Sequence, residues 1–400
     1  MSLPRVEHYF LPGSVSTLSA AAAMNVCSAI ASGMIALTGI VFSLAFVMVQ
    51  FSATAYSPRL VLWVARDPVV SHALGVFIST FLYALMALAW VDRDASGKVP
   101  FISGWLVFAL LLASMAMFIA LIERVGLLQV NRMLIFIGAR GRKAIDELYP
   151  ATAVVSPTAK TAADYQRRVT QTLTHAGRPQ VIQAIDSDAL VNLATRAGAV
   201  IEIAAAVGDT LLERMPLARV CGSGQVVDEE ALKSAIEIGD ERTFEQDPKF
   251  ALRLLVDIAI KALSPAINDP TTAVQALDQI EDLLLRLGSR CLDVGSCRDN
   301  QGSIRLTIPS PDWDDFLRLA LDEIRYCGAS SVQVMRRMKA LIGDLLTVLP
   351  AERHEALRHW ERRLHVTIGR TFADAEEKQE AAVPDRQGLG IGEGKASDLP

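Results

Sequence analysis

Hydrophobic and polar positions divide this chain into an apolar first third and a polar, patterned remainder. Residues 9–58 contain no Asp, Glu, Lys or Arg, and two further uncharged runs occupy residues 69–91 and 99–122. About 20 apolar residues in helical conformation cross the hydrocarbon core of a bilayer, and a soluble helix rarely stays apolar on every face. The pattern therefore predicts three transmembrane helices, over about 29–51, 69–91 and 101–122.

Beyond the third span, the hydrophobic positions follow helical and strand-like periods. An amphipathic helix is expected over 127–148, with interruptions near Gly126 and Gly138. Short β-like runs follow within 180–222, separated by turn signals at Gly198 and Gly208. Their order resembles the small barrel-sandwich fold of lipoyl and biotinyl carriers. Those carriers need a lysine at a hairpin tip, and none occurs between Lys160 and Lys233, so no such cofactor is expected.

The most regular polar stretch, 247–288, predicts a helical hairpin. Asp247 and Asp269 each precede a proline, a pattern typical of an N-cap acid followed by proline at the first helical position. The Ser264-Pro265 pair ends the first helix, and Gly288 ends the second. A weak hairpin signal, DNQG, lies within 291–309, and further helices are expected over 312–327, 330–349 and 351–371.

The predicted fold class is a mainly α membrane protein, with three transmembrane helices followed by a cytoplasmic α+β part. That part combines a small barrel-sandwich-like β-domain with a helical domain. The expected segments are an N-terminal segment 1–28, a transmembrane domain 29–125, a connecting helix and linker 126–178, the β-domain 179–236, the helical domain 237–371 and a disordered tail 372–400.

Charge next to the spans predicts their orientation. The first loop carries Arg59 and Arg66 against Asp67, and basic residues also outnumber acidic ones after the third span. Because positive charge favours the cytoplasmic side, the first loop and the whole C-terminal part are expected in the cytoplasm. The N-terminus is then expected outside.

Composition narrows the function classes. Hydrophobic residues make up 51% of the chain and the net charge is -5, without a basic block of the kind that binds nucleic acid. The five cysteines form no C-x-x-C pair and the histidines are not spaced like metal ligands, so no metal site is expected. Phosphate-loop, dinucleotide and nucleophile-elbow motifs are absent. We therefore expect no cofactor, no catalytic residues and no enzyme.

Small and polar residues recur along the first span at three- and four-residue steps, so they share one helix face. They are Ser32, Ala36, Gly39, Ser43 and Gln50. Small residues allow membrane helices to approach closely, and polar groups find partners at such contacts. Packing is therefore the preferred interpretation of this face. A water-lined path is the alternative, which the lack of acids and bases within the spans disfavours.

A second candidate site lies at the predicted helical hairpin. Polar side chains gather on its first helix and in its turn: Arg253, Lys261, Ser264, Asn268 and Asp269. They are candidates for a polar ligand site. The preferred interpretation is that the last three satisfy backbone groups of the turn and the helix cap.

The chain resembles the domain-of-unknown-function family 2254 of predicted bacterial membrane proteins. The matching words are SGMIALTGIVFSLAFVMVQFSATAYSPRL, LGVFISTFLYAL, IERVGLLQVNRM, IEIGDERTFEQDPKFALRLLVDIAIKALSPAINDPTTAV and LALDEIRYCGASSVQV. The resemblance implies a bacterial inner-membrane location and four spans, one of them ahead of residue 1. That additional span would return the N-terminus to the cytoplasm. The family has no established activity.

Two functions fit these features, and both involve the lipid bilayer. The leading hypothesis is a homo-oligomeric channel or transport-related protein with a cytoplasmic regulatory domain. The sequence does not identify the ion or small molecule that such a channel would carry. The rival is a membrane-anchored scaffold or sensor without a pore. An enzyme acting on a membrane substrate would need a site among the polar residues of the hairpin.

Overall fold

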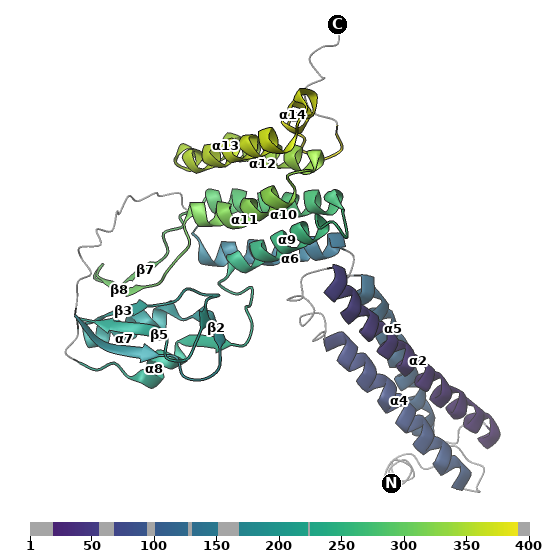
Figure 1. Ribbon diagram of the computed structural model, residues 1–400. Coiled ribbons are helices and arrows are strands. Elements are labelled where there is room, and N and C mark those ends of the chain that lie inside the picture. The colour runs from purple at the N-terminus through teal and green to yellow at the C-terminus, as the bar shows by residue number, and fades with distance from the viewer. Residues whose placement is uncertain are drawn as a thin grey trace. The chain divides into compact units, whose positions relative to one another are not determined.

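The computed structural model describes residues 19–55, 68–93, 101–126, 130–150, 168–222 and 225–390. The chain forms two compact units, residues 1–133 and residues 134–400. The first consists of long apolar helices, and the second combines sheets with helices (Figure 1). A mainly helical membrane protein with a downstream α+β part is therefore confirmed as the fold class.

Three helices of the first unit are long and apolar enough to cross a membrane: α2 (Ala20–Ala55), α4 (Pro68–Arg93) and α5 (Phe101–Gly126). The three predicted spans thus correspond to three helices. The first begins at Ala20 rather than at Ala29 because an alanine run, with the highest helix propensity of any residue, extends it toward the N-terminus.

The inner face of this unit is apolar, with one polar contact at its centre. Met34 of α2, Phe77 of α4 and Leu121 of α5 are among its buried residues. Thr80 and Ser114, both buried, lie 2.9 Å apart between their hydroxyl oxygens, and each hydroxyl oxygen lies 2.8 Å from a carbonyl oxygen of its own helix. One hydroxyl therefore donates to the other, which donates in turn to its own helix. Their hydrogen-bonding capacity is thereby used inside the protein, as a hydrocarbon environment requires.

The second unit contains most of α6 (Val130–Leu148) and two small sheets. The first sheet has the order β1-β5-β3-β8-β7, in which only β3 and β8 pair in parallel, and the second has the order β4-β2-β6. The strands are β1 (Val169–Thr174), β2 (Gln180–Ile185), β3 (Val200–Ile203), β4 (Thr210–Leu211), β5 (Pro216–Cys221), β6 (Ile236–Gly239), β7 (Ser296–Arg298) and β8 (Ile304–Thr307).

The predicted β-like runs correspond to β2, β3 and β5, but the barrel-sandwich arrangement is not confirmed. An amphipathic helix, α7 (Ser187–Ala197), separates β2 from β3, and a short α8 (Glu229–Ser234) precedes β6. Gly198 does mark a turn, since it ends α7 in the left-handed conformation that glycine favours. β1 comes from the segment expected as a linker. The hairpin signal DNQG is confirmed, since residues 299–302 lie between the antiparallel strands β7 and β8 inside the segment assigned to the helical domain.

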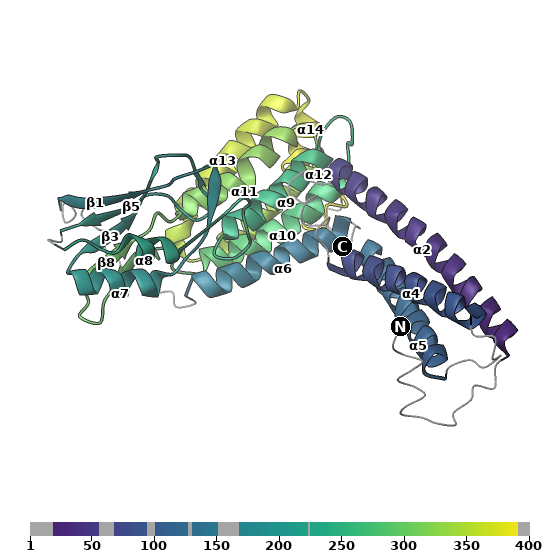
Figure 2. The ribbon, with the colours of Figure 1, turned by 90° about the horizontal axis from the view of Figure 1, so that it is seen from below.

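The helical part is a layered stack (Figures 1 and 2). α9 packs on α10 and α11, while α12 packs on α10 and α13. The helices are α9 (Pro248–Ala262), α10 (Pro270–Gly288), α11 (Trp313–Cys327), α12 (Val332–Val348), α13 (His354–Thr371) and α14 (Ala375–Ala381), with a 3-10 turn at Ala351–Arg353. The predicted hairpin is confirmed as α9 and α10.

Helix α6 is uninterrupted, so the expected break near Gly138 is wrong. Glycine serves close packing in this helix instead. A Cβ placed on Gly141 would lie 2.9 Å from the Cβ of Ala251 and from a methyl carbon of Leu283, closer than real side chains approach. Residues 127–129, which precede α6, lie outside the described residues.

The C-terminal segment differs from the expected disordered tail. Asp374 caps α14 by accepting from the backbone N–H groups of Glu376 and Glu377. The buried Asp385 then accepts backbone N–H bonds from Gln387, Gly388 and Gly390, and Arg386 pairs with Asp344. Capping and ion pairs order this stretch despite its few large apolar residues. Residues 391–400 lie outside the described part of the chain.

Candidate functional site

The predicted face of α2 is exposed along its whole length. Ser32, Ala36, Gly39, Ser43 and Gln50 are all exposed, and a Cβ added to Gly39 would meet nothing within 4 Å. The buried face of the same helix contains Cys27, Met34 and Val41. At 100° per residue the two sets point in opposite directions. The described helices of this unit therefore do not pack against this face.

Asn25 extends this face by two further turns, since it precedes Ser32 by seven residues and is also exposed. We call the six residues from Asn25 to Gln50 the α2 stripe. Large apolar side chains flank it, including Phe42 at 62% and Phe46 at 69% exposure. The sequence analysis did not include Asn25. The seven-residue spacing between Ser43 and Gln50 recurs between Asn25 and Ser32, so the pattern already contained a signal for it.

Helix α4 repeats this arrangement over its first turns. Ser71, Gly75 and Ser79 are exposed, and a Cβ at Gly75 would meet nothing within 4 Å. Ala73 and Phe77, which face the other way, are buried in the unit. Both helices thus carry a row of small residues on the side away from the unit's core, the reverse of the arrangement expected if these small faces mediated contacts between the helices of this unit.

The turn of the helical hairpin uses its polar residues locally. The Asp269 carboxylate accepts from the Thr272 backbone N–H at 3.1 Å and from the Thr272 hydroxyl at 2.6 Å. Ser264 donates to the Lys261 carbonyl at 2.7 Å. Asn268 has a φ of 49°, a left-handed conformation in which Asn is enriched. These contacts are the capping and turn interactions that the sequence analysis preferred for this segment.

Arg253 of the same candidate site lies in a different network. Its guanidinium pairs with Asp257 at 2.5 Å and with Glu323 of α11 at 2.5 Å. The hydrogen bond from Arg253 holds the pKa of Glu323 below its ordinary value, while burial lowers the pKa of Lys261. Arg253 therefore joins α9 to α11, whereas Ser264, Asn268 and Asp269 stabilise the turn.

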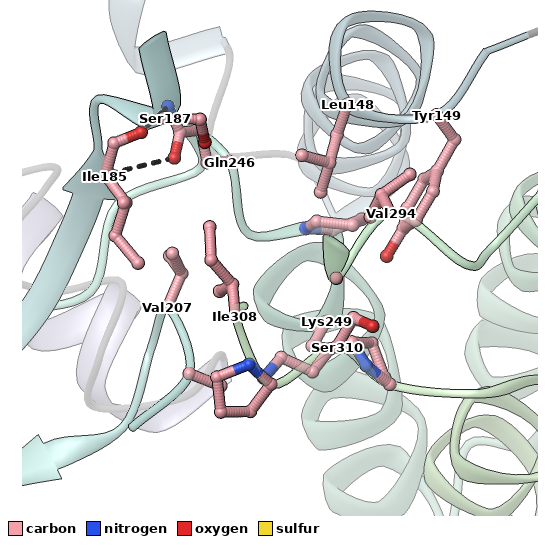
Figure 3. Close-up of a pocket in the computed structure, with 15 residues that line it drawn as sticks. Leu148, Tyr149, Ile185, Ser187, Val207, Gln246, Lys249, Val294, Ile308 and Ser310 are labelled. Atoms are coloured by element: carbon pink, nitrogen blue, oxygen red, sulfur yellow. Dashed lines mark hydrogen bonds between the residues drawn. The ribbon is translucent and has the colours of Figure 1, made fainter. Parts of the chain in front are cut away.

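A small pocket lies where the sheets meet the helices (Figure 3). Its volume is about 80 Å3, well below the roughly 300 Å3 of ordinary ligand sites. Tyr149 and Lys249 line one side, and Ile185 and Gln246 line the other. The Gln246 side chain accepts from the Ile185 backbone N–H at 3.0 Å and donates to its carbonyl, although its own φ is 53°. This pocket therefore belongs to the contact between the sheets and the helices of the second unit.

An ion pair between Arg242 and the buried Asp247 lies next to this contact between sheets and helices. Arg242 donates to one Asp247 carboxylate oxygen through two nitrogens, at 2.8 and 2.6 Å. The other oxygen caps α9 by accepting from the Phe250 backbone N–H. Burial raises the pKa of Asp247, and Arg242 opposes that shift. Burial and the nearby Asp247 both raise the pKa of Tyr149. No metal-ligating cluster of His, Cys, Asp or Glu occurs among the described residues.

Comparison with known proteins places the chain in a family. The model of DUF2254, described as a predicted membrane protein, matches residues 2–344. The chain belongs to this family. Uncharacterized proteins of Mycobacterium bovis (Mb1321c) and Mycobacterium tuberculosis (Rv1290c) are each 28% identical over 331 residues, which is 80% of this chain. The chain spans 63% of the length of these two relatives. No solved structure matches it significantly.

Proposed function

We propose that this DUF2254 protein is the protomer of a homo-oligomeric membrane channel. The observation that carries the proposal is the α2 stripe, which is small, polar and exposed on the side of α2 opposite the protomer's own apolar core. Three helices alone enclose no path, because their inner side is filled by apolar residues and by the Thr80–Ser114 contact. In the proposed assembly, α2 stripes from several copies face a common axis.

Lipid is a poor neighbour for this stripe. Polar residues within membrane helices usually face a helix bundle or a water-filled cavity rather than hydrocarbon. Asn25 and Gln50 carry amides, while Phe42 and Phe46 offer lipid large apolar surfaces on the flanks of the stripe. An arrangement in which the flanks contact lipid or neighbouring copies and the stripe borders water satisfies both sets of side chains.

Location is proposed from the family and orientation from charge. The family resemblance supports a location in the bacterial inner membrane. We propose that the α+β unit lies in the cytoplasm, because basic residues outnumber acidic ones in the first loop and after the third span. The α+β unit then acts as the regulatory domain of the channel.

Cysteine labelling in a background without native cysteines tests this proposal. Ser32→Cys and Ser43→Cys place thiols on the stripe, and Ile35→Cys and Phe42→Cys place matched thiols on its flanks. A membrane-impermeant charged thiol reagent is expected to modify the stripe thiols and to reduce solute flux from liposomes. The flank thiols are expected to stay unmodified, because hydrocarbon excludes the reagent.

Cross-linking between copies separates the remaining outcomes. Stripe thiols that form disulfide-linked dimers yet resist the charged reagent would overturn the channel and leave an oligomeric scaffold without a pore. In that case Gly39→Leu is expected to disrupt assembly by steric clash. Stripe thiols that neither react nor cross-link would overturn the oligomer as well.

A further inference from the structure

A groove on the outer side of the helical stack collects positive charge. Helices α11 and α13 line it, and its volume is about 320 Å3. Its polar lining consists of Arg325, His359, Arg362, Arg363, Thr367 and Arg370. Four guanidinium groups and one imidazole thus surround an open space of small-molecule size.

Two of these arginines are held in place by the protein. Arg325 and Arg363 donate to the same carboxylate oxygen of Asp322, at 2.8 and 3.0 Å. Arg325 also donates to the Thr367 hydroxyl at 2.6 Å, and Arg363 stacks 4.5 Å from the Trp360 ring centre. The Nε of Arg325 is buried and has no hydrogen-bond acceptor among the described residues. One carboxylate therefore orders two cations without neutralising both.

The other two arginines have no ion-pair partner among the described residues. Arg362 and Arg370 are exposed, and neither forms an ion pair with any residue in the described part of the chain. Together with His359, they lie along one side of α13, since Arg362 follows His359 by three residues and Arg370 follows Arg362 by eight. Elsewhere in this unit, Arg242, Arg253 and Arg337 are each paired with carboxylates. Arg362 and Arg370 differ from these three arginines in having no carboxylate partner among the described residues.

We propose that this groove binds an anion that carries a phosphate monoester or diphosphate group. Four guanidiniums against one carboxylate leave about three uncompensated positive charges, which suits a multiply charged anion better than a monovalent one. Guanidinium groups match phosphate oxygens through two parallel N–H donors. The preordered Arg325 and Arg363 form the floor of the site, and the exposed Arg362 and Arg370 close on the ligand from its rim.

Isothermal titration of the full chain in a mild detergent, with inorganic pyrophosphate as the probe, tests the proposal. Arg362→Gln and Arg370→Gln are each expected to weaken binding about tenfold, since a hydrogen bond to a charged group contributes about that factor. Arg358→Gln is the matched control, because Arg358 is an exposed arginine on the same helix that does not line the groove. It removes the same charge and is expected to leave pyrophosphate affinity within about twofold, as a site away from the contact does.

Two results would overturn the site. Equal weakening by Arg358→Gln would indicate diffuse electrostatic attraction rather than a site, and so would equal affinity for pyrophosphate and chloride at matched ionic strength. Absence of pyrophosphate binding by the unmodified chain would also overturn it. Circular dichroism of each variant shows that it is folded.

The source of the phosphate group is decided by a second comparison. Glycerol 3-phosphate and a short-chain phosphatidic acid share a phosphate monoester and differ in their acyl chains. Tighter displacement of pyrophosphate by the lipid than by glycerol phosphate would identify a lipid headgroup. Equal displacement by both would identify a soluble phosphate ester. Failure of both to displace pyrophosphate would contradict the monoester class and restrict the site to diphosphates.

Discussion

Two N-cap aspartates with the same sequence pattern are expected to contribute differently to the free energy of unfolding. Asp247 and Asp269 each cap a helix ahead of a proline, and replacing a cap by alanine costs about 1 kcal/mol. Asp247 is 1% exposed and also holds Arg242. Removing one partner of a buried ion pair costs about 3–5 kcal/mol. Arg242 is 26% exposed, so water partly solvates its charge once Asp247 is removed. We therefore expect loss of the ion pair to cost about 2 kcal/mol of unfolding free energy, less than for a fully buried pair. We expect Asp247→Ala to cost about 3 kcal/mol and Asp269→Ala about 1 kcal/mol.

Urea unfolding of the full chain in a mild detergent measures this difference. Trp313 and Trp360 report on the helical stack when the other tryptophans are changed to Phe, namely Trp63, Trp90 and Trp105. A double-mutant cycle with Arg242→Ala measures the interaction free energy of the Arg242–Asp247 pair. Because the double variant leaves no unpaired charge, its loss of unfolding free energy should be smaller than the sum of the two single losses. Equal costs for Asp247→Ala and Asp269→Ala, or additive costs in the cycle, would refute the reasoning.

Two further predictions concern pH and topology. Burial and the neighbouring Asp344 raise the pKa of Glu281 above its ordinary 4.5, against the opposing effect of Arg337. A raised carboxyl pKa gives stability that is full below about 4.5 and is lost as pH rises through the folded-state value. Relative to Glu281→Gln, the unmodified chain should therefore lose unfolding free energy over that window, and parallel pH profiles would contradict this. Reporter fusions after Ala65 and Lys143 should lie in the cytoplasm, and one at Gly97 should lie outside; a cytoplasmic signal at Gly97 would contradict three spans with this orientation.

Local signals in the sequence were sufficient for the spans and the hairpin. Uncharged length alone located α2, α4 and α5, and Asp-Pro pairs located the starts of α9 and α10. Helix α7 was missed even though Asp186 caps it and Gly198 ends it, because its neighbours have a stronger strand-like period. Two local signals thus conflicted in this segment, the helix caps and the strand-like period, and the local sequence alone did not show which of them the fold would follow.

Features built from distant segments had no local signal. The groove combines Arg325 of α11 with Arg362 and Arg370 of α13, and no spacing within either helix reveals that they share a site. The exposed orientation of the α2 stripe also depended on which face α4 and α5 cover. The ordered C-terminal segment rests on single contacts, such as Arg386 with Asp344, that composition does not record.

The parallel pairing of β3 with β8 has a consequence during protein synthesis. The strands β1, β3 and β5 are complete once Cys221 has been made, but β8 begins at Ile304. This gap of roughly 80 residues takes roughly 4–16 s at roughly 5–20 residues per second. Throughout that interval the nascent sheet offers the unpaired edge of β3, which is a template for strands of other chains. A ribosome that stalls within the helical hairpin therefore leaves an aggregation-prone edge that the finished protein covers with β8.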